Sequence, residues 1–169
     1  MYVINLLNIN QIKMKKIFFI VALLATAFMQ KGFAQDNKNA PSQLLLSYYD
    51  IKNALVTGNV NTASIKAEEF VKTLIGIDAK IINEATRGAL LRNAGHISES
   101  KEIKLQREHF ASFSINMYTL AKAVRLIEAP VYYAYCPMKK THWLSSEPTI
   151  KNPYFGSAML TCGKVEETL

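Results

Sequence analysis

The chain has 169 residues, of which 20 are basic and 13 acidic, and its formal net charge is +7. Four of the basic residues (Lys13, Lys15, Lys16 and Lys31) but none of the acidic ones lie in the first 34 positions. Without that segment, 16 basic and 13 acidic residues remain for a net charge of +3, with no arginine cluster, which argues against nucleic-acid binding.

Residues 14–34 have the order of a cleaved secretory signal. A charged start at Met14-Lys15-Lys16 precedes the apolar run Ile17–Met29, and Gly32-Phe33-Ala34 supplies small residues before a cut. We predict a signal peptide over residues 1–34, cleaved after Ala34, and a periplasmic or otherwise exported mature protein. The apolar run is too short for a stable membrane span; the alternative is a retained membrane anchor. Residues 1–13 fit no signal pattern, so Met14 is an alternative start.

The remaining residues, about 135, suffice for one domain with a hydrophobic core. Residues 35–41 are polar and are predicted to form a flexible tether, followed by a single domain over residues 42–169. Apolar residues recur at helical spacing in four segments, residues 42–58, 59–76, 78–98 and 101 to about 126.

Capping residues mark the ends of these segments. Ser42, Asn59 (or Asn61) and Asp78 are the expected N-caps of the first three, and Gly58 and Gly76 are the expected ends of the first two. The fourth segment contains no glycine or proline and carries the most regular apolar seam: Ile103, Gln106, Phe110, Phe113, Met117, Leu120 and Val124. The pattern predicts a mainly α fold, an antiparallel four-helix bundle.

The tail, residues 130–169, has a different character. Val131–Tyr135 is aromatic and strand-prone, and Met159–Val165 is the segment that could pair with it as a short β-hairpin. Three of the five prolines lie between them, which predicts an irregular connection. With few periodic apolar residues of its own, such a tail needs a disulfide or a metal to pin it.

Both cysteines lie in this tail, and each is close to a methionine. Cys136 is followed by Met138, and Met159 precedes Cys162. Thiolate and thioether sulfurs suit Cu(I), with zinc as the borderline competitor, so the four residues are the candidate metal ligands. The alternative is a structural Cys136–Cys162 disulfide, which would close a loop of about 27 residues and contribute roughly 3–4 kcal/mol.

His96 and His109 are secondary candidates for imidazole ligands. On one continuous helix they would lie about 140° apart around the axis. On two helices, antiparallel packing need not bring them together. Met117 is expected in the core and His142, beside Trp143, in a loop.

Motifs of common enzymes are missing from the sequence. It has no Gly-x-Ser-x-Gly around a serine, no His-Glu-x-x-His and no Cys-x-x-Cys. We predict a protein without enzymatic activity.

Several runs resemble the family called domain of unknown function 3347: Tyr135-Cys136-Pro137-Met138, Trp143-Leu144-Ser145, Ile150 to Gly156, Met159 to Gly163, and the helical Gln106-Arg107-Glu108-His109-Phe110 with Phe113-Ser114. The resemblance implies an exported protein of Gram-negative bacteria, and some members are associated with periplasmic adaptor subunits of copper and heavy-metal efflux systems. Phe113 replaces the family's usual leucine, and the loop from Met138 to Trp143 is short, which counts against a role for His142.

The expectation is therefore an exported periplasmic protein that captures or delivers copper or another soft heavy metal in connection with efflux, with an efflux adaptor or another envelope protein as partner. The alternative is a non-catalytic envelope interaction module whose cysteines form only a structural disulfide.

Overall fold

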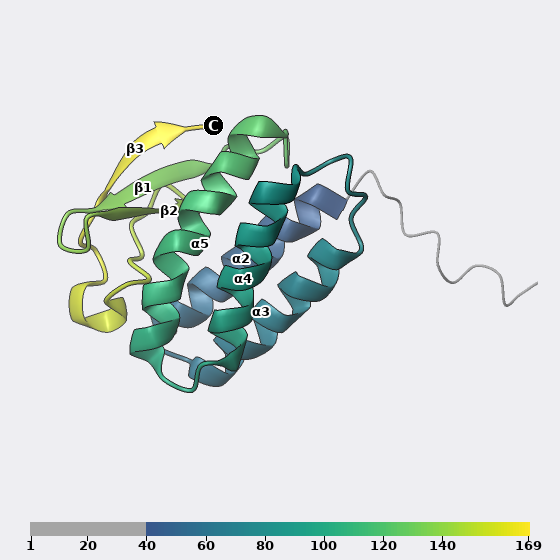
Figure 1. The fold of residues 1–169 in the computed structure, drawn as a ribbon. Coiled ribbons are helices and arrows are strands. Elements are labelled where there is room, and N and C mark those ends of the chain that lie inside the picture. The colour runs from purple at the N-terminus through teal and green to yellow at the C-terminus, as the bar shows by residue number, and fades with distance from the viewer. Residues whose placement is uncertain (1–39) are drawn as a thin grey trace, which may run out of the picture. The chain divides into compact units, whose positions relative to one another are not determined.

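The helices α2 (Ala40–Thr57), α3 (Val60–Ile75), α4 (Glu84–Glu99) and α5 (Ile103–Ala123) come first, and three short strands follow (Figure 1). The computed structural model describes residues 40–169. Consecutive helices pack against each other, which confirms the predicted helical bundle. The predicted signal peptide, its cleavage site and the alternative start all lie outside the described residues. Within those residues, no helix is both long and apolar enough to cross a membrane.

The turn between α2 and α3 confirms the predicted cap residues. Gly58 has a φ of +73°, its N–H donates to Leu55 O, and the N–H of Asn59 donates to Ala54 O. This pair of bonds is the Schellman motif, which favours glycine at the left-handed position. The Asn59 side chain then accepts the N–H of Thr62 at 3.0 Å and begins α3.

Two predicted helix starts are wrong. Ser42 lies inside α2, which already includes Ala40 and Pro41, and its hydroxyl donates to Leu126 O at 2.6 Å instead of capping. The third helix begins at Glu84, because Asn83 caps it and Asp78 accepts the N–H of Lys80 in a tight turn.

Helix α5 ends at Ala123, about one turn before the predicted end near Leu126. Val124 is already extended, with φ −134° and ψ 128°, although no glycine or proline is present. The extended chain that follows buries Leu126 and Val131 against the core. Tertiary packing has here overridden local helix propensity.

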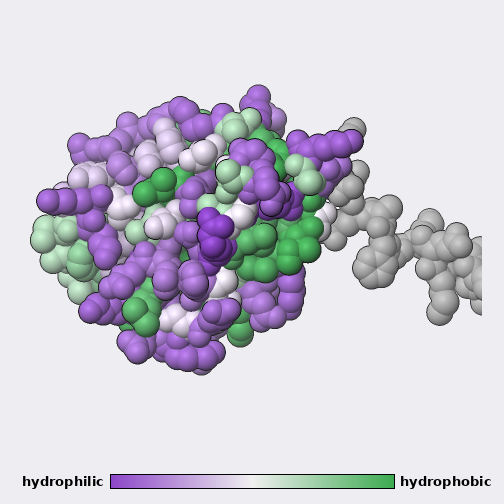
Figure 2. All heavy atoms as spheres, viewed as in Figure 1, coloured by the Kyte–Doolittle hydropathy of each residue, from purple (hydrophilic) through white to green (hydrophobic). Residues whose placement is uncertain are grey.

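Aromatic side chains form the centre of the core. Tyr48 stacks on Phe110 with centroids 5.3 Å apart, and Phe113 meets Phe70 edge to face at 4.8 Å. The predicted seam of α5 is confirmed, since Gln106, Phe110, Phe113, Met117 and Leu120 are all buried. Figure 2 shows mostly hydrophilic residues on the visible face, with hydrophobic ones scattered between them.

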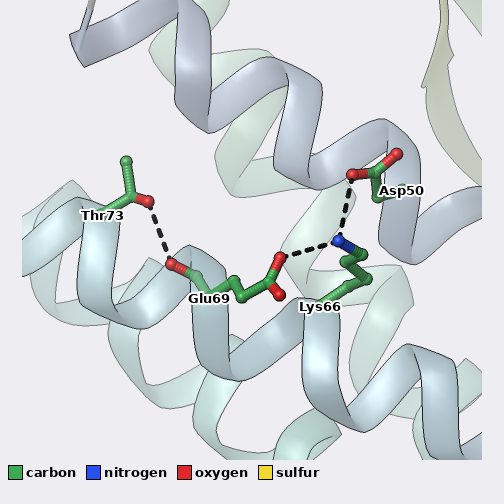
Figure 3. Close-up of polar contacts among 4 residues, drawn as sticks. All are labelled: Asp50, Lys66, Glu69 and Thr73. Atoms are coloured by element: carbon green, nitrogen blue, oxygen red, sulfur yellow. Dashed lines mark hydrogen bonds and ion pairs between the residues drawn. The ribbon is translucent and has the colours of Figure 1, made fainter.

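An exposed polar cluster lies between α2 and α3 (Figure 3). Lys66 of α3 is 2.8 Å from Glu69 and 3.9 Å from Asp50 of α2, and the Thr73 hydroxyl donates to the backbone oxygen of Glu69. The hydrogen bond with Glu69 raises the pKa of Lys66. Exposed pairs of this kind contribute little to stability.

The tail forms a three-stranded antiparallel sheet of order β2-β1-β3, from β1 (Tyr132–Cys136), β2 (Thr141–Ser145) and β3 (Lys164–Thr168). The strand at Val131–Tyr135 and its pairing with the C-terminal segment are confirmed in outline. The partner strand lies further along the chain than predicted, because Gly156–Met159 forms a 3₁₀ turn. The expected irregular connection is wrong in part, since residues 141–145 form β2 and place His142 in a strand.

Candidate metal centre

His96 and His109 meet on the surface of the helical bundle. His96 lies in the last turn of α4 and His109 in the second turn of α5. Their rings are stacked, with centroids 4.8 Å apart and planes 27° apart. His96 is exposed and His109 is half-buried. The short turn between α4 and α5 therefore brings together the two imidazoles that sequence spacing alone did not pair.

Two imidazoles at this separation can share one metal ion. Ligating nitrogens lie about 2.0–2.1 Å from zinc, so a shared ion needs two ring nitrogens roughly 3–4 Å apart. The two rings are stacked face to face with centroids 4.8 Å apart, so both side chains would have to rotate before their nitrogens could ligate one ion. Among the described residues, no group of three or more His, Cys, Asp or Glu is placed to hold a metal.

Cys136 ends β1 and is fully buried. Its sulfur accepts hydrogen bonds from Asn152 Nδ2 at 3.1 Å and from the backbone N–H of Lys139 at 3.4 Å. A metal ion would reach this sulfur only after Asn152 and the turn at Lys139 had moved away.

Asn152 holds the two cysteine segments together. Its Nδ2 also donates to the carbonyl of Cys162 at 2.7 Å, and its Oδ1 accepts the N–H of Tyr154 at 2.8 Å. The side chain is fully buried. The two cysteines are not bonded to each other in the structure, and Cys162 is half-buried in the turn before β3. The buried amide of Asn152 thus connects the two cysteine segments of the tail. The disulfide between Cys136 and Cys162 stays a prediction.

The two methionines of the tail face solvent. Met138 is 61% exposed in the turn between β1 and β2, and Met159 is 39% exposed at the end of the 3₁₀ turn. Cys136 and Met138 therefore occupy opposite environments although they are two residues apart. The Cys/Met set predicted from the sequence does not form a ready pocket for a small ion in this arrangement.

His142 belongs to the sheet. Its ring stacks on Tyr133 with centroids 4.4 Å apart, and Tyr133 stacks on Tyr118 of α5 at 3.9 Å. His142 Nε2 lies 2.9 Å from Glu166 Oε2, and the hydrogen bonds from His142 and Lys164 lower the pKa of that carboxyl. These contacts join β2 to β3 and to α5, which is a structural role.

Sequence reasoning missed Asn152 and the pairing of the two histidines. Asn152-Pro153 lies inside a run that carries the family resemblance, and a buried role for Asn152 could have been inferred from it. The histidine pair could have been found by folding residues 84–99 and 103–123 back on each other about the turn at residues 100–102.

Comparison with protein families matches residues 44–129 to the family described as protein of unknown function (DUF3347). The match spans the four helices and includes both His96 and His109, whereas the sheet and the sulfur-containing tail lie beyond it. No curated protein and no solved structure matches the chain.

Proposed function

The chain belongs to the DUF3347 family, and we propose that it is an exported metal-binding protein in which His96 and His109 provide the first ligands for a copper ion. The observation that supports this proposal is the 4.8 Å separation of the two rings at the surface. Imidazole nitrogens bind copper and zinc well, and Cu²⁺ exceeds Zn²⁺ in affinity for a given set of nitrogen ligands. The proposed role is binding rather than catalysis.

The sulfur residues of the tail form a second proposed ligand set, specific to Cu(I). Asn152 forms hydrogen bonds to the sulfur of Cys136 and to the carbonyl of Cys162, which keeps the two cysteine segments close. Met138, two residues after Cys136, is exposed. Because the Cys136 sulfur is buried, Cu(I) binding there requires the tail to open. The two ligand sets are proposed as separate sites, the histidine pair for a divalent ion and the tail for copper that is already in the Cu(I) state.

Titration with Cu(II) and Zn(II) tests the histidine pair. We expect one equivalent to bind, and the changes His96→Ala and His109→Ala each to weaken binding at least tenfold. His142→Ala is the matched control, because the third histidine of the chain lies in the sheet and is paired with Glu166. The protein must be purified without a histidine tag, and Cys136→Ser with Cys162→Ser removes the thiols that Cu(II) would oxidise. Equal affinities in the wild type and in the two variants would contradict the proposal.

Titration with Cu(I) under reducing conditions tests the tail. Binding that survives the double change Cys136→Ser and Cys162→Ser, and is instead lost in His96→Ala with His109→Ala, would assign Cu(I) to the histidines and refute the sulfur site.

Export is proposed from the signal-like leader. Expression of the whole chain followed by intact mass measurement of the periplasmic fraction should give a species beginning at Gln35. An uncleaved chain in the membrane fraction would favour the retained anchor. The association with an efflux adaptor is proposed from the family resemblance and is tested by co-purification with and without copper.

A further inference from the structure

A cleft of about 240 Å³ lies where the start of α5 meets the tail. It is separate from the histidine pair. Its wall is made by four residues of the first two turns of α5, one residue of the β1–β2 turn and two residues before the 3₁₀ turn: Ile103, Lys104, Arg107, Glu108, Lys139, Tyr154 and Phe155.

Arg107 is the most informative residue of this cleft. Its Nη2 donates to the carbonyl of Leu55 at 2.8 Å, which satisfies part of the C-terminus of α2. Its Nε is buried and has no hydrogen-bond partner among the described residues. No carboxylate within this part of the chain lies within ion-pair distance of the guanidinium. Burial accordingly lowers the pKa of Arg107. A half-buried guanidinium without an anion is costly, and an anionic ligand would compensate it.

Two lysines add to this charge. Lys104 and Lys139 are exposed on the same cleft, and neither forms an ion pair with another described residue. Glu108 is the one acidic residue of the wall, so the formal charge of the lining is +2. The first turn of α5, which has no side-chain N-cap, faces the same region and contributes the positive end of its dipole.

The rest of the lining is apolar. Tyr154 is buried, and Ile103 and Phe155 are half-buried, so each offers hydrocarbon surface beside the cations. The volume is below the roughly 300–1,000 Å³ of sites for drug-sized ligands, which restricts the occupant to a small molecule.

We propose that this cleft binds a small organic dianion that carries a compact apolar group, in the class of phosphate monoesters. Two negative charges balance the lining, and the apolar group covers Ile103 and Phe155. A monocarboxylate would leave one positive charge without compensation, and a long polyanion would extend beyond a cleft of this size.

Phenyl phosphate is the probe that tests this inference, in an NMR titration of the ¹⁵N-labelled protein. We expect saturable shifts at Ile103, Lys104 and Phe155 with a dissociation constant in the millimolar range or tighter. Inorganic phosphate, which lacks the apolar group, and benzoate, which has one charge, should each bind more weakly. An absence of shifts at 10 mM phenyl phosphate overturns the proposal, as does tighter binding of benzoate.

Matched variants separate a local site from general charge attraction. Lys104→Gln with Lys139→Gln should weaken phenyl phosphate binding at least tenfold. Lys80→Gln with Lys101→Gln removes the same charge from exposed lysines that do not line the cleft, and should change the affinity less than twofold. Equal losses of affinity in both double variants would mean that net charge alone explains the binding, and would refute the site. The double variant His96→Ala with His109→Ala, measured in the presence of a metal chelator, should bind phenyl phosphate with unchanged affinity. The outcome of this test therefore does not depend on the metal proposal.

Discussion

Removal of one hydroxyl, that of Tyr48, should weaken the attachment of the sheet to the helices. This group is fully buried, lies 2.7 Å from Ser114 Oγ of α5 and accepts the backbone N–H of Leu144 at 3.0 Å. Leu144 lies in β2, an outer strand of the sheet. The hydroxyl therefore satisfies a strand-edge amide that would otherwise be buried without a partner. The change Tyr48→Phe keeps the ring stacked on Phe110 and removes only the oxygen.

The expected cost can be worked out from the groups that lose their partners. A buried donor left without an acceptor costs about 1–3 kcal/mol. Ser114 can turn its hydroxyl to a carbonyl of its own helix, so its loss is smaller, about 0.5–1 kcal/mol. The sum is about 1.5–4 kcal/mol in the free energy of unfolding, or a fall in Tm of roughly 5–16 °C for a domain of this size.

Tyr49→Phe is the matched control for this measurement. The neighbouring tyrosine is only 6% exposed, but its hydroxyl has no hydrogen-bond partner in the described part of the chain. Removing that oxygen should leave the free energy of unfolding unchanged or raise it slightly. Urea unfolding followed by circular dichroism measures both variants. A Tyr48→Phe protein within 0.5 kcal/mol of the wild type, or a Tyr49→Phe protein that loses more, would refute the reasoning.

The remaining predictions concern other positions of the fold. Gly95→Ala should stabilise α4 by about 0.5–1 kcal/mol in thermal unfolding, because an added Cβ meets nothing within 4 Å. Gly156→Ala should destabilise by about 2 kcal/mol or more, since φ is +57° and the Cβ would lie 2.7 Å from Val56 O; equal effects of the two changes would contradict the packing described. Burial lowers the pKa of Lys52, so this side chain binds its proton more tightly in the unfolded chain than in the folded one. The free energy of unfolding of the wild type should therefore rise as the pH approaches about 10.4, the ordinary pKa of lysine. Lys52→Met should remove that rise and increase the urea midpoint at pH 7, and a lower midpoint would argue for an anionic partner. Hydrogen bonds from Lys122 and Tyr118 lower the pKa of Glu167. Hydrogen bonds from His142 and Lys164 lower the pKa of Glu166. Their contribution is present above about pH 4.3 and is lost as pH falls through the folded-state pKa values. The protection factors of the β3 amides, which correct for the intrinsic exchange rate at each pH, should therefore fall at pH 3, and this fall should be absent in Glu166→Gln with Glu167→Gln.

Much of the bundle could be predicted because its signals are local. Gly58 and Asn59 mark a turn through their own backbone and side-chain chemistry, and the seam of α5 follows from the spacing of Phe110, Phe113 and Met117. The early end of α5 could not be predicted in this way. It depends on Leu126 and Val131, which are buried by distant parts of the chain.

The candidate site depended on relations that spacing does not contain. His96 and His109 meet only because the turn at residues 100–102 sets the register of two helices. Asn152 holds Cys136 and Cys162 through hydrogen bonds that form after the tail has folded against the sheet. The sulfur residues were found by composition, whereas their burial, which decides access to a metal, is a property of the packed tail.

The most direct test of the account is an NMR titration with Zn(II) that observes the imidazole resonances of the protein. His96 and His109 should change together and reach saturation at one equivalent, while His142 should remain unaffected. Shifts confined to one histidine, equal shifts at all three, or saturation that persists in His96→Ala with His109→Ala would contradict a shared site at the stacked pair.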